Sequence, residues 1–174
     1  LVGRTFYHSE SDITLDDEPT EIKKKVFLGA MSSLSKNADI AANECMDAQK
    51  LLSAANRIII LGHGASASIC QYAFFRLTEL GLNCVCNPDA HMNAAILTHP
   101  RPGDVILCVS QSGETADLYK QIEMAYQRRI PAILITGAPG SSIARLSQVI
   151  LSTVSEERNI LTDALNSRVS QFCL

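Results

Sequence analysis

The sequence contains no tryptophan, few aromatic residues and little excess charge of either sign. Of its 174 residues, 5% are aromatic, 19% are charged and 47% are hydrophobic, and the formal net charge is −3. A domain that grips nucleic acid by itself needs an electropositive surface, so this balance argues against direct DNA binding. The short basic clusters Lys23-Lys24-Lys25 and Arg128-Arg129 are more typical of solvated helix faces than of phosphate-backbone contacts.

Long apolar runs and metal-binding patterns are also missing. No stretch approaches the roughly 18 apolar residues that a membrane span requires, and no signal-peptide layout is present. The six cysteines form no C-x-x-C pair and no Cys/His spacing that suits zinc. Cys84, Cys86 and Cys108 fall in strand-like segments, where a reduced thiol packs as a small apolar group. We therefore expect a cytoplasmic protein with no metal, no cofactor and no membrane contact.

The two ends of the chain have unusual compositions. The first residue is not Met, and residues 1–19 are rich in Ser, Asp and Glu, which favours a linker or the fringe of a preceding domain. Apolar residues repeat at helical spacing from Leu161 to Phe172 and so continue almost to the last residue. We interpret the chain as a fragment of a longer protein in which residues 20–174 form one domain.

Between these ends, apolar residues follow two alternating patterns. Helical spacing predicts two helices between Thr20 and Ala55 with a break near residues 35–39. The strands expected after them are 57–61, 83–86, 104–109, 131–135 and 148–152. The helices expected between and after these strands are 66–80, 90–97, 114–129, 142–146 and one from about 159. We predict a three-layer α/β/α sandwich with a five-stranded parallel sheet in the flavodoxin-like order 2-1-3-4-5.

The hydroxyl-rich segment Ser110-Gln111-Ser112-Gly113-Glu114-Thr115 lies between an expected strand and an expected helix. The first amides of a helix have no partner within the helix and lie at the positive end of its dipole, so an anion is stabilised there without lysine. Three hydroxyl groups add donors, and Gly113 lets the backbone approach closely. We attribute to Glu114 a favourable charge at the helix start rather than a catalytic role. The segment is suited to holding a phosphate group.

A second small-residue turn, Gly62-His63-Gly64-Ala65-Ser66, follows the first strand. In the predicted strand order both turns open into one crevice at the carboxyl edge of the sheet. Gly62-x-Gly64-x-x-Ala67 also fits the dinucleotide fingerprint, which leaves a nicotinamide cofactor as an alternative. That fingerprint requires an acidic residue at the end of the second strand, but here Asn87-Pro88 stands there and Asp89 follows late.

The two turns together resemble the sugar isomerase (SIS) domain family, whose members bind phosphosugars. The likeness covers roughly residues 50–155 and is sharpest in Ser110 to Asp117, while Gly64-Ala65-Ser66 matches the first loop of the family. The residues that the resemblance places in the phosphosugar site are Ser66, Ser110, Gln111, Ser112, Gly113, Thr115, Gly64 and His63. Without the family, Ser and Thr at a helix start would be ordinary caps.

Within that family, the chain is most similar to the sugar-sensing domain of RpiR-type transcriptional regulators. The similar features are the two leading helices, Asp89-x-His91, Pro102-Gly103-Asp104 and Ser167-Arg168-x-x-Gln171. Such regulators carry an N-terminal helix-turn-helix domain that this chain lacks. The resemblance therefore implies DNA contact for the parent protein only.

Sugar-phosphate isomerisation would require a carboxylate or imidazole at the reacting carbon. Phosphoheptose isomerases resemble the chain in the first loop but carry acidic residues late in the next helix, at positions that fall here at about Phe75-Arg76. The remaining candidates for that role are His63 and the Glu156-Glu157 pair. His91 would contact the ligand or a partner subunit, and His91 and Glu157 are further candidates for ligand binding. A structural imidazole and a solvated first-turn carboxylate are the commoner roles of such residues.

We therefore expect a phosphosugar-binding effector domain of a bacterial RpiR-type regulator, with ligand sensing rather than catalysis. A sugar-phosphate aldose-ketose isomerase is the alternative, and a purely structural dimerisation module is the third possibility. Residues 58–75 and 102–119 contain no Lys or Arg, so neutral donors and the helix dipole must supply the affinity. Apolar stripes on the leading and closing helices predict a homodimer or a symmetric higher oligomer.

Overall fold

The structure is a computed structural model that describes residues 13–14, 16–38, 42–154 and 163–174. Their contacts divide them into two units, and each is considered by itself. The larger unit consists of the described residues from 42 to 153. The smaller unit combines the described residues up to 38 with those from 154 onward.

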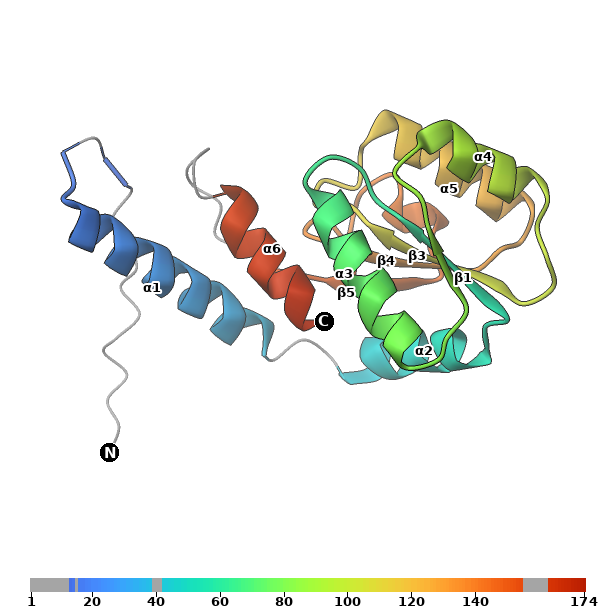
Figure 1. Ribbon diagram of the computed structural model, residues 1–174, viewed down its shortest axis with the longest axis horizontal. Helices are drawn as coiled ribbons and strands as arrows, with labels where there is room; N and C mark the ends of the chain where they lie inside the picture. The colour runs from blue at the N-terminus through green and yellow to red at the C-terminus, as the bar shows by residue number, and fades with distance from the viewer. Residues whose placement is uncertain (1–12, 15, 39–41, 155–162) are drawn as a thin grey trace. The chain divides into compact units, whose positions relative to one another are not determined.

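The larger unit is a parallel five-stranded sheet with helices on both faces (Figure 1). Its strands are β1 (Arg57–Leu61), β2 (Cys84–Cys86), β3 (Asp104–Val109), β4 (Ala132–Thr136) and β5 (Val149–Ser152). Its helices are α2 (Ala42–Ala54), α3 (Ser66–Glu79), α4 (Ala90–Thr98), α5 (Ala116–Gln127) and the 3-10 turn η1 (Ala144–Leu146). The strand order is β2-β1-β3-β4-β5, and every neighbouring pair is parallel, which confirms the predicted sheet.

Two hydrophobic cores lie on opposite faces of this sheet. Ile59 and Ile106 point to the face covered by α4 and α5, where they join Leu118 and Ile122 of α5. The alternate strand residues point to the face covered by α2 and α3. Because successive side chains of a strand alternate between faces, a strand that is apolar throughout is buried on both sides. This explains why all residues of β1, β3 and β4 are buried.

A buried ion pair joins the first residues of the adjacent strands β1 and β3. The Arg57 guanidinium donates to both carboxylate oxygens of Asp104, at 2.9 and 2.6 Å, and the Arg101 amide donates to the same carboxylate at 2.8 Å. Gly103, with φ +80°, turns the chain into β3, and its carbonyl accepts from the Asn56 amide at 2.8 Å. The Pro102-Gly103-Asp104 segment therefore fixes the register of β1 against β3.

The smaller unit contains α1 (Pro19–Asn37) and α6 (Asp163–Cys173), which pack against each other. Gly29 allows the close approach, because a Cβ there would lie 3.2 Å from the Asn166 side chain. The Asn37 side-chain amide donates to the Val154 carbonyl at 2.6 Å and accepts from the Val154 amide at 2.7 Å. In the Ser167-Arg168-x-x-Gln171 segment, Arg168 donates to Gln171 at 2.6 Å, so this feature contributes bonds within the unit.

The predicted elements that lie within the described residues agree with the structure to within about two residues, and β1 and β3 agree at both ends. The largest offsets are at α5, which begins at Ala116 rather than 114, and at η1, which begins at Ala144 rather than 142. The closing helix is described only from Asp163. Among the described residues no helix combines the length and apolar character that crossing a membrane requires.

Candidate functional site

The carboxyl ends of four adjacent strands bring four loops to one edge of the sheet. Leu61 pairs with Cys108 at the ends of β1 and β3, so the two small-residue turns start side by side. Gly62 makes this approach possible, because a Cβ there would lie 2.5 Å from Cys70 Sγ and 3.0 Å from the Val109 carbonyl oxygen. The structure thus brings together the turns at 62–66 and 110–115, as the strand order predicts.

The turn after β3 folds tightly on its own hydroxyl groups. The Gly113 amide donates to Ser110 Oγ at 3.1 Å, and the Glu114 amide donates to Ser112 Oγ at 3.2 Å. Gly113 has φ +62°, a conformation that favours glycine. Ser110 is buried, whereas Ser112 and Thr115 are exposed. The Ser110 hydroxyl therefore stabilises the turn, whereas the side chains of Ser112 and Thr115 are exposed to solvent.

Helix α5 begins without a side-chain cap. Thr115 occupies the N-cap position in an extended conformation, but its side chain makes no capping hydrogen bond. The first intrahelical bond runs from the Tyr119 amide to the Thr115 carbonyl, at 2.8 Å. The amides of Ala116, Asp117 and Leu118 consequently have no partner within the helix. The ordinary capping role that Thr115 could have filled does not apply, and the positive end of α5 faces the carboxyl edge.

The turn after β1 is built differently. The Ser66 amide donates to the His63 carbonyl and the Ala67 amide to the Gly64 carbonyl, both at 3.1 Å, so the first amides of α3 are already occupied. Ser66 is buried inside the first helical turn. Gly64 is exposed with φ +57°, and a Cβ there would meet nothing within 4 Å. The turn at 62–66 can therefore contact a ligand through side chains and exposed backbone, but not through unpaired amides at the start of α3.

Glu114 has a tertiary contact that the sequence did not indicate. Its carboxylate accepts from the Ser142 amide at 2.7 Å, in the loop after β4. This hydrogen bond, with a smaller contribution from the charge of Arg145, lowers the pKa of the Glu114 carboxyl. Arg145 donates to Ser142 Oγ at 3.0 Å. A cation therefore lies near the hydroxyl turn, although the neighbouring sequence contains none.

The loop after β4 supports the hydroxyl turn and was not predicted as part of the site. A side chain at Gly113 would overlap Ser141, and one at Gly137 would overlap Gln111. The Gly137 amide donates to the Gln111 carbonyl at 3.1 Å, and Thr136 Oγ1 donates to the same oxygen at 3.3 Å. The signal was available, because residues 136–142 form a third Gly- and Ser-rich stretch directly after a strand.

The remaining predicted site residues are less closely tied to the turns. One ring nitrogen of His63, Nε2, is buried and has no hydrogen-bond partner in the described part of the chain. His91 is exposed in the first turn of α4, and its amide donates to the Asp89 carboxylate at 2.7 Å. Glu156 and Glu157 lie outside the described residues. Their roles stay predictions.

Asp89 also bears on the dinucleotide alternative. Its carboxylate accepts from the amides of His91 and Met92, at 2.7 and 3.0 Å, and so caps α4. The hydrogen bonds from these amides lower the pKa of the Asp89 carboxyl. Asp89 thus serves as the N-cap of α4, while the end of β2, where the fingerprint requires an acidic residue, is followed by Asn87-Pro88.

Cysteine and metal chemistry are not evident in the described residues. The six cysteines are free thiols, and burial raises the pKa of Cys108 well above its ordinary range, so this thiol stays protonated. No group of three or more His, Cys, Asp or Glu side chains within the described ranges is arranged to hold a metal ion.

Two bacterial regulators are similar to nearly the whole chain. An uncharacterized HTH-type transcriptional regulator of Thermotoga maritima is 31% identical over 164 residues, which are 94% of this chain and 59% of that protein. The HTH-type transcriptional regulator RpiR of Escherichia coli is 29% identical over 168 residues, which are 94% of this chain and 56% of that protein. The chain thus spans a little over half the length of these relatives.

Solved structures show the same architecture. The Vibrio vulnificus NanR protein complexed with ManNAc-6P matches with a TM-score of 0.83 and 26% identity over 91% of this chain and 59% of that one. A phosphoheptose isomerase from Francisella tularensis matches with a TM-score of 0.68 and 17% identity over 90% of this chain and 96% of that one, which shows the fold alone. The family model of the SIS domain matches residues 51–174. The chain therefore belongs to the SIS domain family and is similar within it to RpiR-type transcriptional regulators.

Proposed function

We propose that this chain is the ligand-sensing part of a bacterial transcriptional regulator and that it binds a phosphorylated sugar at the carboxyl edge of its sheet. The observation that carries the proposal is the uncapped start of α5, where Thr115 makes no capping bond beside a hydroxyl-rich turn. A phosphate group there would accept from the amides that lack intrahelical partners and from the exposed hydroxyls of Ser112 and Thr115. The complex of NanR with ManNAc-6P supports the same class of ligand.

The expected affinity suits a metabolite sensor. Each hydrogen bond to a charged group contributes about 1.5–3 kcal/mol, and ordering costs reduce the sum, so a binding free energy of about 4–8 kcal/mol is reasonable. This corresponds to dissociation constants from about millimolar to micromolar. Sensing further requires that the ligand favour one arrangement of the protein over another. The parent protein would contact DNA through a separate helix-turn-helix domain, as the names of its relatives suggest.

Isomerase activity is the second candidate, because the fold is shared with a phosphoheptose isomerase. The positions that carry acidic residues in such enzymes hold Phe75 and Arg76 here, in the last half of α3. His63 is the remaining base candidate in the described part of the first turn, since its Nε2 is without a partner there. The regulator relatives and the missing acids both support sensing over catalysis.

A thermal-shift panel of hexose, pentose and amino-sugar phosphates tests the proposal. Inorganic phosphate and the unphosphorylated sugars serve as controls. We expect a selective rise in Tm with one class of phosphosugar, by mass action, and no interconversion of aldose and ketose at saturating ligand. Ser110→Ala should abolish the rise. An unchanged phosphosugar response in that variant would contradict the proposal and favour a structural module, whereas turnover that is lost in His63→Gln would establish an isomerase.

A further inference from the structure

A surface hollow lies at the amino edge of the sheet, at the opposite end of the strands from the turns described above. Its volume is about 420 Å³, and it is lined by the end of α2, residues 100–105 and residues 128–131. These segments lie before or at the starts of β1, β3 and β4, whereas the hydroxyl turn follows β3. Because the strands are parallel, the hollow and the turn are at opposite ends of the same strands. The hollow is thus independent of the proposed phosphosugar site.

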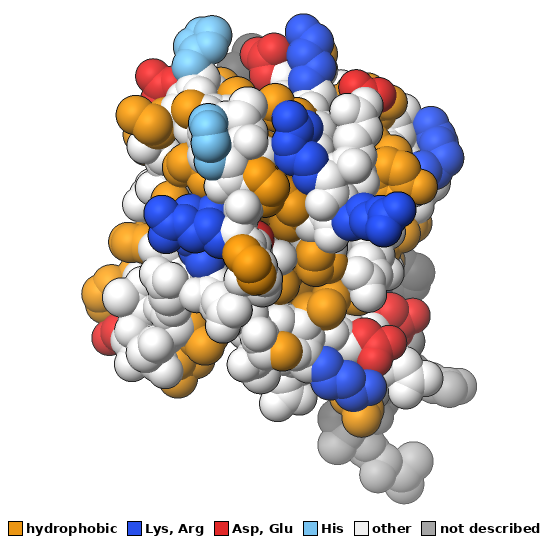
Figure 2. Space-filling view, turned by 90° about the vertical axis from the view of Figure 1, so that its right-hand side faces the viewer, with side chains coloured by type: hydrophobic (Ala, Val, Ile, Leu, Met, Phe, Trp, Pro, Cys, Tyr) orange, Lys and Arg blue, Asp and Glu red, His pale blue; other side chains and the backbone are white. Residues whose placement is uncertain are grey.

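The lining of this hollow carries excess positive charge. Arg101, Arg128 and Arg129 are exposed along it. Asp104 is the one acidic residue among the described residues of the lining, and its carboxylate already accepts from Arg57 and the Arg101 amide. The whole chain has a net charge of −3, so this concentration of arginine does not reflect the composition. Figure 2, which views the right-hand side of Figure 1, shows Lys and Arg side chains standing around hydrophobic surface.

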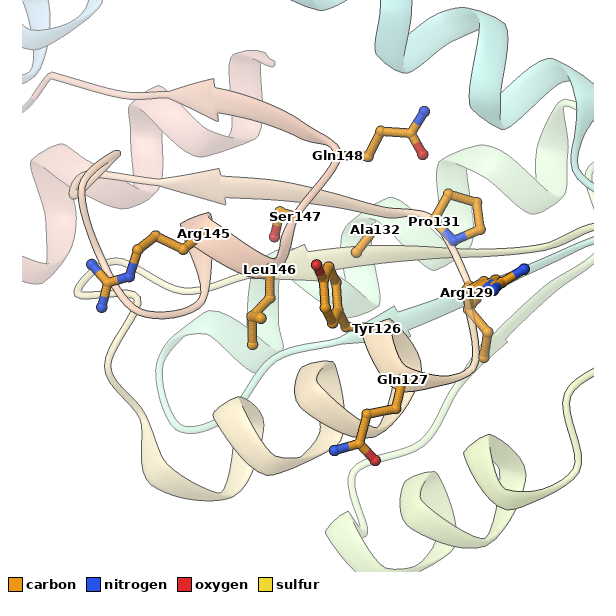
Figure 3. A pocket seen from close by; sticks show the side chains of 10 residues that line it. Tyr126, Gln127, Arg129, Pro131, Ala132, Arg145, Leu146, Ser147 and Gln148 are labelled. Atoms are coloured by element: carbon orange, nitrogen blue, oxygen red, sulfur yellow. The ribbon is translucent and has the colours of Figure 1, made fainter.

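Attraction to helix ends accounts for only part of this charge. Arg128 donates to the Met124 carbonyl of α5 at 3.1 Å, which is an ordinary role for a cation at a helix C-terminus. The guanidinium groups of Arg101 and Arg129 form no hydrogen bond or ion pair with the residues that the structure describes. In Figure 3, which shows the neighbouring hollow, the Arg129 side chain is directed away from Tyr126 and Leu146.

The backbone at Arg129 also indicates a role for its side chain. Helices α3 and α5 end in the same motif, in which one residue has positive φ and the next amide returns to the last helical turn. At α3 this residue is Gly81, with φ +80°, and the Leu82 amide donates to the Leu77 carbonyl at 3.1 Å. At α5 it is Arg129, with φ 58°. Glycine is preferred at this position, so the arginine is kept there at a cost of roughly 1 kcal/mol.

We propose that the hollow at the amino edge binds the phosphate group of a small molecule, with Arg101, Arg128 and Arg129 as its ligands. Guanidinium groups match phosphate oxygens in a paired geometry and stay charged at every physiological pH. Leu51 and Ala54 supply an apolar wall for the rest of the molecule. The volume lies in the range of small-ligand sites.

The test is an NMR titration of the ¹⁵N-labelled chain with inorganic phosphate and with phenyl phosphate. We expect saturable shifts of the Gly103, Arg129 and Ile130 amides, and phenyl phosphate should bind at least as tightly as phosphate because its ring covers the apolar wall. Arg129→Gly should weaken binding at least tenfold without lowering Tm, since glycine suits the positive φ. Arg76→Gln, in an exposed pair with Glu79 at 2.6 Å on α3, is the charge-matched control and should bind normally.

Four results would overturn the proposal. These are the absence of saturable shifts, unchanged affinity in Arg129→Gly, an equal loss in Arg76→Gln, and shifts produced by a short DNA duplex but not by either phosphate probe. Ser110→Ala should leave the shifts at the amino edge intact while it abolishes the phosphosugar response. Failure of either site can therefore be distinguished from failure of the other.

Discussion

At the scale of single residues, the hydroxyl groups of the turn after β3 have different tasks. The sequence indicates a cluster of donors, and the structure places Ser110, Ser112 and Thr115 in one turn as expected. It could not indicate that Ser110 Oγ accepts from the Gly113 amide while Thr115 leaves the start of α5 uncapped. These roles depend on the positive φ of Gly113 and on the loop after β4, which contacts the turn although it is distant in sequence.

Comparison of two variants should separate support of the turn from ligand binding. Ser110→Ala removes the acceptor of the buried Gly113 amide and should lower the free energy of unfolding by about 1–2 kcal/mol. Thr115→Val removes a hydroxyl that caps nothing, so stability should stay within about 0.5 kcal/mol. Ser110→Ala should abolish phosphosugar binding, and Thr115→Val should weaken it. Urea unfolding and thermal shifts measure the two effects, and a large loss of stability in Thr115→Val would show that its hydroxyl has a structural role.

Two glycines with similar backbone conformations should respond differently to substitution. Gly113 has φ +62° and faces the Ser141 hydroxyl, so Gly113→Ala adds a steric overlap to the backbone cost. Gly64 has φ +57° in open space, so Gly64→Ala adds only the backbone cost of about 1 kcal/mol. We expect Gly113→Ala to lose at least about 2 kcal/mol more than Gly64→Ala in urea unfolding. Equal losses would mean that the loop after β4 does not support the turn.

At the scale of the elements, the strands were the most predictable features. β1 and β3 each combine one charged first residue with a continuous apolar run, and a glycine-containing turn follows each strand. The start of α5 was placed two residues early because Glu114 was assigned to the helix start, whereas its carboxylate bonds to Ser142. The pairing of Arg57 with Asp104 was also beyond prediction, since it requires the register of β1 against β3. The local pattern of apolar residues predicts the helices and strands, whereas tertiary contacts determine the roles of the residues at their ends.

The Arg57–Asp104 pair should make stability depend on acid pH. Burial raises the pKa of the Asp104 carboxyl, but hydrogen bonds from Arg57 and the Arg101 amide, with the charges of both arginines, outweigh burial and lower it overall. A lowered pKa in the folded state means that the stabilisation is complete above the unfolded value of about 4 and is lost as pH falls through the folded value. The free energy of unfolding of the wild type, measured from denaturation curves, should therefore fall steeply below about pH 4.

Asp104→Asn tests the origin of that slope. The variant leaves the Arg57 charge buried without its partner, so at pH 7 it should lose about 3–5 kcal/mol. Its stability should also fall less steeply than that of the wild type below about pH 4. Asp47→Asn, in an exposed pair with Lys50 at 2.9 Å, is the matched control and should change stability by less than about 1 kcal/mol. An unchanged acid slope in Asp104→Asn would assign the effect to other carboxylates.

At the scale of the whole molecule, the parallel sheet separates two kinds of chemistry. All strands point the same way, so the uncapped start of α5 faces the carboxyl edge, while the arginines near its end face the amino edge. The sequence indicated the first edge through its Ser- and Gly-rich turns. For the second edge it shows only the short Arg128-Arg129 cluster, because Arg101 joins these residues only when β3 and β4 pair. Spatial grouping of residues far apart in sequence is what the structure adds.

Exposed apolar side chains on α1 favour self-association. Phe27 and Met31 are four residues apart on α1 and are 62% and 52% exposed, so they form an apolar stripe on one side of that helix. We expect sedimentation equilibrium to show a dimer or a larger symmetric assembly at tens of micromolar. Phe27→Glu should weaken association at least tenfold, whereas Lys23→Gln, which changes the charge of α1 by the same amount, should leave it intact. A monomer at every concentration would remove the stripe as an interface, and an equal effect of both variants would make the association electrostatic rather than apolar.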